Sequence, residues 1–117
     1  MKKSKIVEKQ WGNEEILIND KYCVKLLHLK VNNHCSYHLH KSKDELFYLL
    51  KGSIYVRYNK TDITLHTGDY LHIPCNTSHL FYGLSEATIL ECSTNDSGID
   101  NWRSAIKSNN HINNSGK

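Results

Sequence analysis

The feature that most constrains the fold is a succession of short β-type segments separated by turn residues. The segments are rich in β-branched and aromatic residues, and they recur at spacings of about 8–12 residues. Such a pattern predicts an all-β fold, either a sandwich or a barrel of the jelly-roll kind. Strands are predicted over residues 14–19, 22–31, 35–40, 45–50, 53–58, 63–66, 70–74, 79–84 and 87–93.

The length of the chain, 117 residues, suits one domain with one core. We expect this domain to cover residues 1–106, with a short helical turn over residues 100–106. Residues 107–117 are polar and rich in Asn. They cannot bury enough apolar surface to become ordered, so they are predicted to form a disordered tail.

Charge and composition exclude several classes of protein. The formal net charge is +3 and no long basic run occurs, which argues against a nucleic-acid-binding protein. No segment approaches the roughly 20 apolar residues of a membrane helix, and the basic N-terminus lacks the apolar stretch of a signal peptide. The cysteines form no CxxC pair, so we expect a cytoplasmic protein whose thiols are reduced and mostly buried (Cys23, Cys35, Cys75 and Cys92).

Two histidines and a glutamate stand at the start of an apolar segment, in SYHLHKSKDELFYLL. His38 and His40 are two residues apart on a predicted strand, so their side chains share one face. A hairpin would bring Glu45 opposite them, and His79 is the candidate for a fourth ligand from a later strand. Imidazole and carboxylate groups are typical ligands of a divalent transition metal.

The opposing interpretation is that these are ordinary strand histidines. The chain has eight histidines, so an HxH triplet can arise by chance. His28, His66 and His72 are expected to be strand residues that face solvent or make one hydrogen bond, and neither His34 nor His111 is expected to bind a ligand. The triplet alone therefore does not define a metal site, and the residues around it decide the matter.

Two motifs resemble the conserved boxes of the cupin superfamily. The first is His38-x-His40-x4-Glu45-x6-Gly52, and the second is Gly68-x5-Pro74-x4-His79. The chain departs from the second box at Asn76, where Gly is usual, and at Gly83, where Asn is common. The resemblance implies a cupin jelly-roll β-barrel with one metal ion held by His38, His40, Glu45 and His79. The ion would be Zn, Mn, Fe, Co or Ni.

A wider similarity extends to the small isomerase domain of type II mannose-6-phosphate isomerases and to D-lyxose isomerase-like cupins. It rests on segments QWG (10–12), KYCVKLLHLK (21–30), ILECST (89–94) and DNWR (100–103). Gln10 replaces a proline, only part of an acidic pair remains before Arg103, and the nucleotidyltransferase domain of the type II enzymes is absent. The resemblance implies an aldose–ketose isomerase acting on a sugar or sugar phosphate, in activated-sugar or surface-polysaccharide metabolism.

Isomerisation needs a base that moves a proton between adjacent carbons. The candidates are Glu45, Glu91 and Lys25, although Lys25 is also a plausible solvated lysine and Glu91 a plausible salt-bridge partner of Arg103. Arg57 and Arg103 are candidates for binding phosphate, because a guanidinium matches phosphate bidentately. Tyr48, among several tyrosines, is a candidate for contacting the sugar.

Two other functions share these features. An iron-dependent cupin dioxygenase would use the same ligands, and a non-catalytic module would bind a sugar or another small ligand without turnover. Barrels of this kind often pair through an edge strand, so a homodimer is expected. No nucleic acid or membrane partner is predicted.

Overall fold

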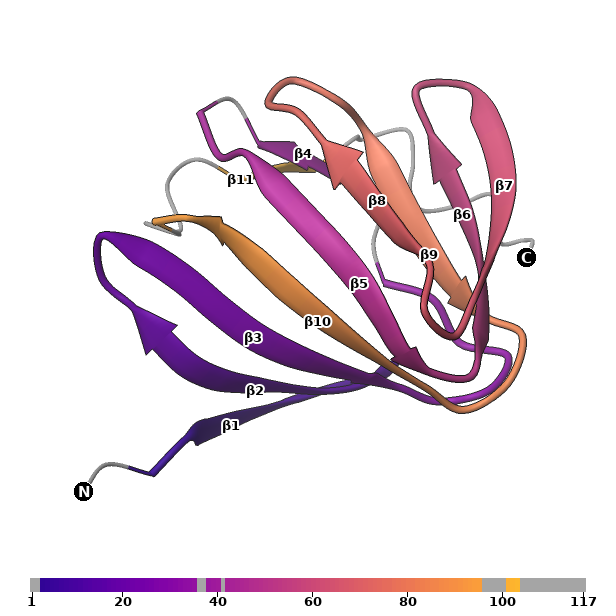
Figure 1. The fold of residues 1–117 in the computed structure, drawn as a ribbon, viewed down its shortest axis with the longest axis horizontal. Coiled ribbons are helices and arrows are strands. Elements are labelled where there is room, and N and C mark those ends of the chain that lie inside the picture. Colours follow the sequence, from indigo (N-terminus) through magenta and orange to yellow (C-terminus); the bar gives the residue numbers. More distant parts are fainter. Residues whose placement is uncertain (1–2, 36–37, 41, 96–100, 104–117) are drawn as a thin grey trace.

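The computed structural model describes residues 3–35, 38–40, 42–95 and 101–103, with side chains in the same ranges except at positions 38, 40 and 101–103. Eleven strands form two antiparallel sheets that face each other, and no helix occurs in these ranges (Figure 1). The predicted all-β class is thus confirmed, in an arrangement consistent with a jelly roll. None of the described segments is a helix long and apolar enough to cross a membrane.

The larger sheet has six strands in the order β1-β2-β3-β10-β5-β8. Strand β10 lies inside this sheet and pairs with β3 on one side and with β5 on the other. Its strands are β1 (Lys5–Lys9), β2 (Gly12–Asn19), β3 (Tyr22–Leu29), β10 (Ala87–Thr94), β5 (Glu45–Lys51) and β8 (Tyr70–Ile73).

The smaller sheet has five strands in the order β11-β4-β9-β6-β7. Its strands are β11 (Asn101–Arg103), β4 (His38–His40), β9 (His79–Gly83), β6 (Ser53–Tyr58) and β7 (Thr61–His66). Strand β4 joins β9 through the register pair His38–His79. Two residues that lie far apart in the sequence are therefore neighbours in this sheet.

Three local predictions are wrong. Residues 5–9 form strand β1, which was missed because only Ile6 and Val7 are apolar there. Residues 101–103 form a strand paired with β4 rather than part of a helical turn. Strands β4 and β5 do not form a hairpin, because they belong to different sheets. The predicted tail over 107–117 lies outside the described residues.

The core fills the space between the two sheets. Inward residues of β5 alternate with outward ones, as a strand with one buried face requires, and they place Phe47 and Leu49 at 2% and 0% exposure. Phe47 meets Phe81 of β9 edge to face, with ring centroids 4.6 Å apart. Trp11 is partly buried and packs against this core.

Several of the connections between strands have left-handed backbone conformations at non-glycine residues. Asn76, at the position where the second box usually has Gly, has φ 64°, a left-handed conformation that Asn tolerates well. Asn59 and Lys60 both have positive φ at the β6–β7 hairpin, as a type I′ turn demands.

Gly83 has no room for a side chain, because a Cβ atom there would lie 2.6 Å from the carbonyl oxygen of Lys30.

The four cysteines are free thiols, but the expectation that they are mostly buried holds only in part. Cys23 is fully buried, Cys35 and Cys92 are partly exposed, and Cys75 is exposed. The Cys35 sulfur lies against the backbone of Phe81, whose N–H donates to it at 3.4 Å. Burial raises the pKa of the Cys35 thiol to about 11.

These environments predict an order of thiol reactivity. Because the thiolate is the reactive form, Cys75 is expected to react with Ellman's reagent at pH 8 at least about 100-fold faster than Cys35 or Cys23. Mass spectrometry of the labelled peptides measures the order. The Cys75→Ser variant is the control and should lose the fast phase, whereas fast labelling of Cys23 in the folded protein would contradict the fold described here.

Candidate functional site

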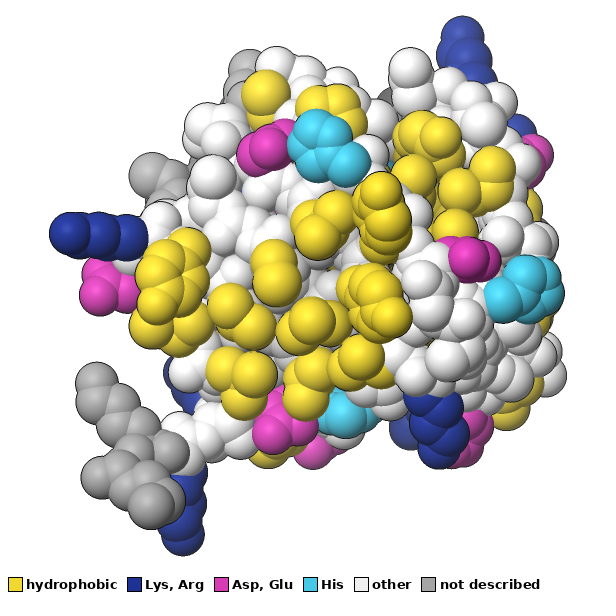
Figure 2. All heavy atoms as spheres, viewed as in Figure 1, with side chains coloured by type: hydrophobic (Ala, Val, Ile, Leu, Met, Phe, Trp, Pro, Cys, Tyr) yellow, Lys and Arg dark blue, Asp and Glu magenta, His cyan; other side chains and the backbone are white. Residues whose placement is uncertain are grey.

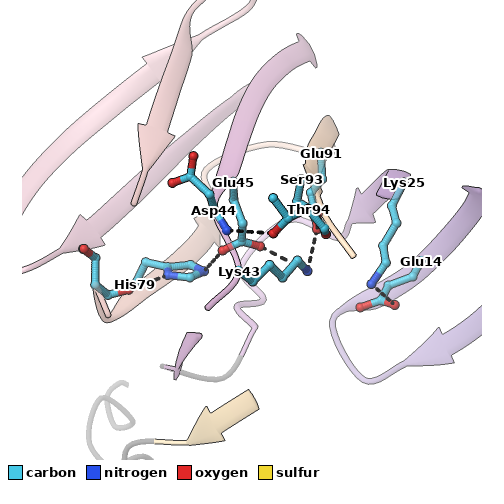
Figure 3. Close-up of polar contacts among 10 residues, drawn as sticks. Glu14, Lys25, Lys43, Asp44, Glu45, His79, Glu91, Ser93 and Thr94 are labelled. Atoms are coloured by element: carbon cyan, nitrogen blue, oxygen red, sulfur yellow. Dashed lines mark hydrogen bonds and ion pairs between the residues drawn. The ribbon is translucent and has the colours of Figure 1, made fainter. Parts of the chain in front are cut away.

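A buried polar cluster lies between the sheets at the end where β5 and β9 begin (Figure 3). Glu45 is the first residue of β5 and His79 is the first residue of β9, so the two come from different sheets. Their relative exposures are 3% and 1%. Two of the four residues predicted to hold a metal are thus brought together in the interior.

The protonation of the His79 ring follows from its neighbours. Nδ1 lies 3.0 Å from the carbonyl oxygen of Thr77. A carbonyl only accepts, so Nδ1 carries the proton and donates. In the neutral ring, Nε2 is then an acceptor, and it lies 3.4 Å from Oε1 of Glu45. Two acceptors face each other there, an arrangement that a proton or a cation between them would stabilise.

The second oxygen of Glu45 belongs to a buried ion-pair network. Lys43 Nζ lies 3.4 Å from Glu45 Oε2 and 2.8 Å from Glu91 Oε2. Ser93 Oγ donates to the same Glu91 oxygen at 3.1 Å. All three charged groups are at most 5% exposed. The Lys43 ammonium therefore holds two carboxylates that come from neighbouring strands.

A further ion pair, between Lys25 and Glu14, lies beside this network. Lys25 on β3 is the register partner of Glu91 on β10, and both residues are buried. Lys25 Nζ lies 3.6 Å from Glu14 Oε1 on β2. Lys25 is therefore not the solvated lysine that one reading of the sequence proposed. Glu91 does form a salt bridge, as one reading predicted, but its described partner is Lys43.

Two groups of this cluster, the His79 imidazole and the Glu45 carboxylate, have the chemistry of ligands for a divalent cation. Glu14, Glu45 and Glu91 contribute three carboxylates against the two ammonium groups of Lys25 and Lys43. An imidazole nitrogen with a fixed tautomer and a carboxylate oxygen are ligands of Zn, Mn, Fe, Co or Ni. Two such atoms can bind one ion with bonds of about 2.1 Å when they are a little over 3 Å apart, and the separation here is 3.4 Å.

The two histidines of the HLH triplet are placed by their backbone. Strand β4 lies beside β9, with His38 in register with His79 and His40 in register with Asn101. The side chains of His38 and His40 lie outside the described part of the chain. Where side chains are described, no group of three or more His, Cys, Asp or Glu residues has the spacing of a metal site.

The predicted substrate residues do not join the cluster where they are described. Tyr48 points to the outer face of the larger sheet, opposite to Glu45, and is 37% exposed. Arg57 lies on the surface of the smaller sheet, with Nε 3.0 Å from Asp62 Oδ1. Arg103 is on β11 in register with His38, and its side chain lies outside the described residues.

Lys43 is the residue that sequence reasoning missed. Residues 41–44 (KSKD) lie between two predicted strands, where a hairpin places a turn, so Lys43 was not expected to be buried. Residues 43, 45, 47 and 49 are all buried, with exposed residues between them. The two-residue alternation of β5 therefore extends back to Lys43, and this periodicity was the signal that pointed to a buried lysine.

Comparisons with known proteins agree with this architecture. The family of the cupin domain matches residues 25–92, which is more than half of the chain. No curated protein sequence matches the chain.

Several solved structures share the fold. KdgF from Halomonas sp. has a TM-score of 0.70 at 16% identity, over 74% of this chain and 82% of that one. A putative sugar phosphate isomerase from Acidithiobacillus ferrooxidans has a TM-score of 0.66 at 16% identity, over 81% and 69%. The capsular polysaccharide assembling protein CapF from Staphylococcus aureus has a TM-score of 0.73 at 15% identity, over 88% of this chain but 32% of CapF.

Proposed function

The chain belongs to the cupin domain family, and from this membership we propose that it is a metal-dependent sugar isomerase. In this proposal His38, His40, Glu45 and His79 hold one divalent ion. The substrate is a sugar or sugar phosphate, and the reaction interconverts an aldose and a ketose. The names of two similar structures, a putative sugar phosphate isomerase and a capsular polysaccharide assembling protein, are in line with a role in sugar or surface-polysaccharide metabolism.

One observation carries the proposal. The buried acceptor Nε2 of His79 faces Glu45 Oε1 at 3.4 Å, and the Thr77 carbonyl fixes the ring in the tautomer that a metal ligand needs. The backbone of His38 runs in register with His79, so the HLH triplet is next to this pair. The three predicted histidine ligands therefore come from two adjacent strands.

The remaining polar groups have separate roles in this proposal. A divalent ion supplies Lewis-acid stabilisation for the charge that develops on the sugar oxygens. Glu45 serves as a ligand, so Glu91 is the carboxylate left to accept the carbon-bound proton. Lys43 stabilises Glu91 while that group is ionised, at 2.8 Å. Lys25 is paired with Glu14, so in this proposal it adds a positive charge to the site and does not act as the base. Arg103 on β11 is the candidate for binding a phosphate.

The metal site is tested by affinity. His79→Ala, and His38→Ala combined with His40→Ala, are each expected to weaken Co²⁺ or Zn²⁺ binding by at least about 100-fold, because each removes a direct ligand. Isothermal titration and elemental analysis of the purified protein measure the loss. His72→Ala is the matched control, since His72 is exposed and bound to Asp44 at 3.0 Å. Unchanged metal content in the His79 variant would overturn the site.

The isomerase activity is tested separately. The metal-loaded protein is incubated without oxygen in D₂O with a panel of aldoses, ketoses and their phosphates, and NMR detects exchange at the carbon that loses its proton. Exchange that disappears in Glu91→Gln, with metal binding retained, supports the proposal. Turnover only in the presence of O₂ would identify a dioxygenase instead, and affinity without exchange would identify a binding module.

A further inference from the structure

We propose that a hollow at the end of the larger sheet opposite to Glu45 is a second binding site, for an uncharged polyhydroxylated molecule of monosaccharide size. Its volume is about 230 Å³, a little below the ~300 Å³ at which pockets for drug-sized ligands begin. It lies where β2 and β10 begin and where β1, β3 and β5 end. Its polar lining includes Glu8, Asn13, His28, Thr88 and Lys51.

These five residues form one row across the sheet. Cross-strand partners share a face, and the register pairs Asn13 with Glu8 on one side and with His28 on the other. Thr88 in turn pairs with His28 and with Lys51. The neighbours of His28 in β3 are buried, so the row lies on the outer face of the sheet. A carboxylate, an amide, an imidazole, a hydroxyl and an ammonium group thus follow one another along the hollow.

The row differs from the rest of the outer face. In Figure 2, hydrophobic side chains gather over the middle of the sheet, and acidic and histidine side chains lie at their border. The next row across the same central strands is Leu26–Leu90–Tyr48. Hydrogen-bonding groups therefore replace apolar ones on β3 and β10 at the place where the surface is hollowed.

Asn13 has a buried polar atom without a partner. Its Oδ1 is shielded from solvent, and no described residue forms a hydrogen bond with it. A buried carbonyl oxygen without a donor costs free energy, which a ligand could recover by supplying the donor. The χ2 torsion of Asn is soft, so a turn of the amide can bring either end to a bound molecule. A hydroxyl group suits both ends, because it donates to the oxygen and accepts from the NH₂ group.

His28 and Thr88 are oriented by a chain of hydrogen bonds. His28 Nε2 lies 3.0 Å from Glu15 Oε1, and Ser4 Oγ donates to the other oxygen of Glu15 at 2.9 Å. The carboxylate only accepts, so Nε2 carries the proton, and Nδ1 of the neutral ring accepts from the Thr88 hydroxyl at 3.4 Å. The Thr88 oxygen then offers its acceptor capacity to a hydroxyl group of the ligand.

The charged residues of the lining balance one another. Glu8 and Glu86 contribute two carboxylates, and Lys30 and Lys51 contribute two ammonium groups. An anion would meet the carboxylates and a cation would meet the ammonium groups, so neither has an advantage. Ala87 adds an apolar contact, against which the CH groups of a sugar can pack. The lining therefore favours an uncharged ligand that both donates and accepts hydrogen bonds.

The hollow is remote from the candidate metal centre. Lys51 and Glu45 are the two ends of β5, which has seven residues, so the ends of this strand are ~20 Å apart. The second site therefore does not rest on the proposed isomerase function, and each can fail without the other.

The test is a ¹H–¹⁵N NMR titration of the full chain, with EDTA present to remove metal ions. The ligands are D-glucose, D-mannose, D-fructose and glycerol, each added up to ~100 mM, because a small site with few contacts binds in the millimolar range. Inorganic phosphate is titrated for comparison. At least one of the sugars or glycerol should give saturable shifts of the amide signals of Asn13, His28 and Thr88.

Two nearly isosteric variants then remove hydrogen-bonding groups from the hollow. Asn13→Leu and Thr88→Val should each weaken the binding of that ligand by at least ~5-fold. Asn13→Leu should also leave the Tm unchanged or raise it, because the unpartnered oxygen is gone, whereas a purely structural Asn13 would give a lower Tm. Thr64→Val, at an exposed position of β7, is the matched control and should bind like the wild type.

Three results would overturn the proposal. The first is the absence of saturable shifts with every sugar and with glycerol, or shifts confined to the surroundings of Glu45 and His79. The second is an affinity that stays unchanged in both Asn13→Leu and Thr88→Val. The third is tighter binding of phosphate than of any sugar at the hollow, which would contradict the assigned class of ligand.

Discussion

Replacing Lys43 by methionine is expected to destabilise the protein by ~3 kcal/mol and to lower its Tm by about 10–15 °C. The Lys43 ammonium is 2% exposed and contacts the carboxylates of both Glu45 and Glu91. Removing it leaves two buried negative groups next to each other without this cation. Breaking a buried ion pair from one side is costly for that reason, even where the intact pair adds little net stability.

Urea unfolding and thermal melting of the metal-free protein measure this effect. Lys51→Met on the exposed end of β5 is the control, and it should change stability by less than about 0.5 kcal/mol. The double variant Lys43→Met with Glu91→Gln should recover part of the loss, because it removes one of the two uncompensated charges. If Lys43→Met were as stable as the control, the buried network would not have the described arrangement.

Replacing Gly12 by alanine is expected to cost about 3–5 kcal/mol or to prevent folding. Gly12 has φ 148°, and a Cβ atom there would lie 1.8 Å from the carbonyl oxygen of His28. That oxygen belongs to the backbone of β3, the strand with which β2 pairs. The overlap can be relieved only by moving the two strands apart. This close approach explains the glycine of the QWG segment.

Gly68 provides the matched control for this substitution. It has φ 97°, but no atom lies within 4 Å of the position that a Cβ would occupy. Gly68→Ala should therefore show only the backbone strain of about 1–3 kcal/mol. Equal losses of unfolding free energy in the two variants would mean that conformational strain, rather than contact with His28, explains the requirement at Gly12.

Alternation within segments was enough to predict most of the fold. Strands such as β3, β5 and β10 combine apolar residues with β-branched or aromatic ones between clear turns, so their positions follow from local sequence. Strand β1 was missed because Ile6 and Val7 are its only apolar residues. The predicted pairing of β4 with β5 was also wrong. A short sequence separation favours a hairpin, but β4 and β5 belong to different sheets.

The spacing of the two motifs was enough to predict which residues of the candidate site meet at its centre. It was not enough to predict contacts that depend on which strands pair. Glu45 and His79 were identified by the two boxes, and they meet at 3.4 Å. The partner of Glu91 could not be predicted from the sequence, because Lys43 lies just before β5 and reaches Glu91 across the pairing of β5 with β10. Tyr48 was assigned to the substrate by residue type, although its parity relative to Glu45 places it on the outer face.

The origin of Glu45 and His79 in opposite sheets has a thermodynamic consequence. An ion held by both residues would bridge β5 and β9, and the unfolded chain would have no equivalent cross-connection. Binding of the ion would then raise the free energy of unfolding by RT ln(1 + [ion]/Kd), where Kd is the dissociation constant of the ion. The melting temperature would rank candidate ions by affinity before any substrate is known.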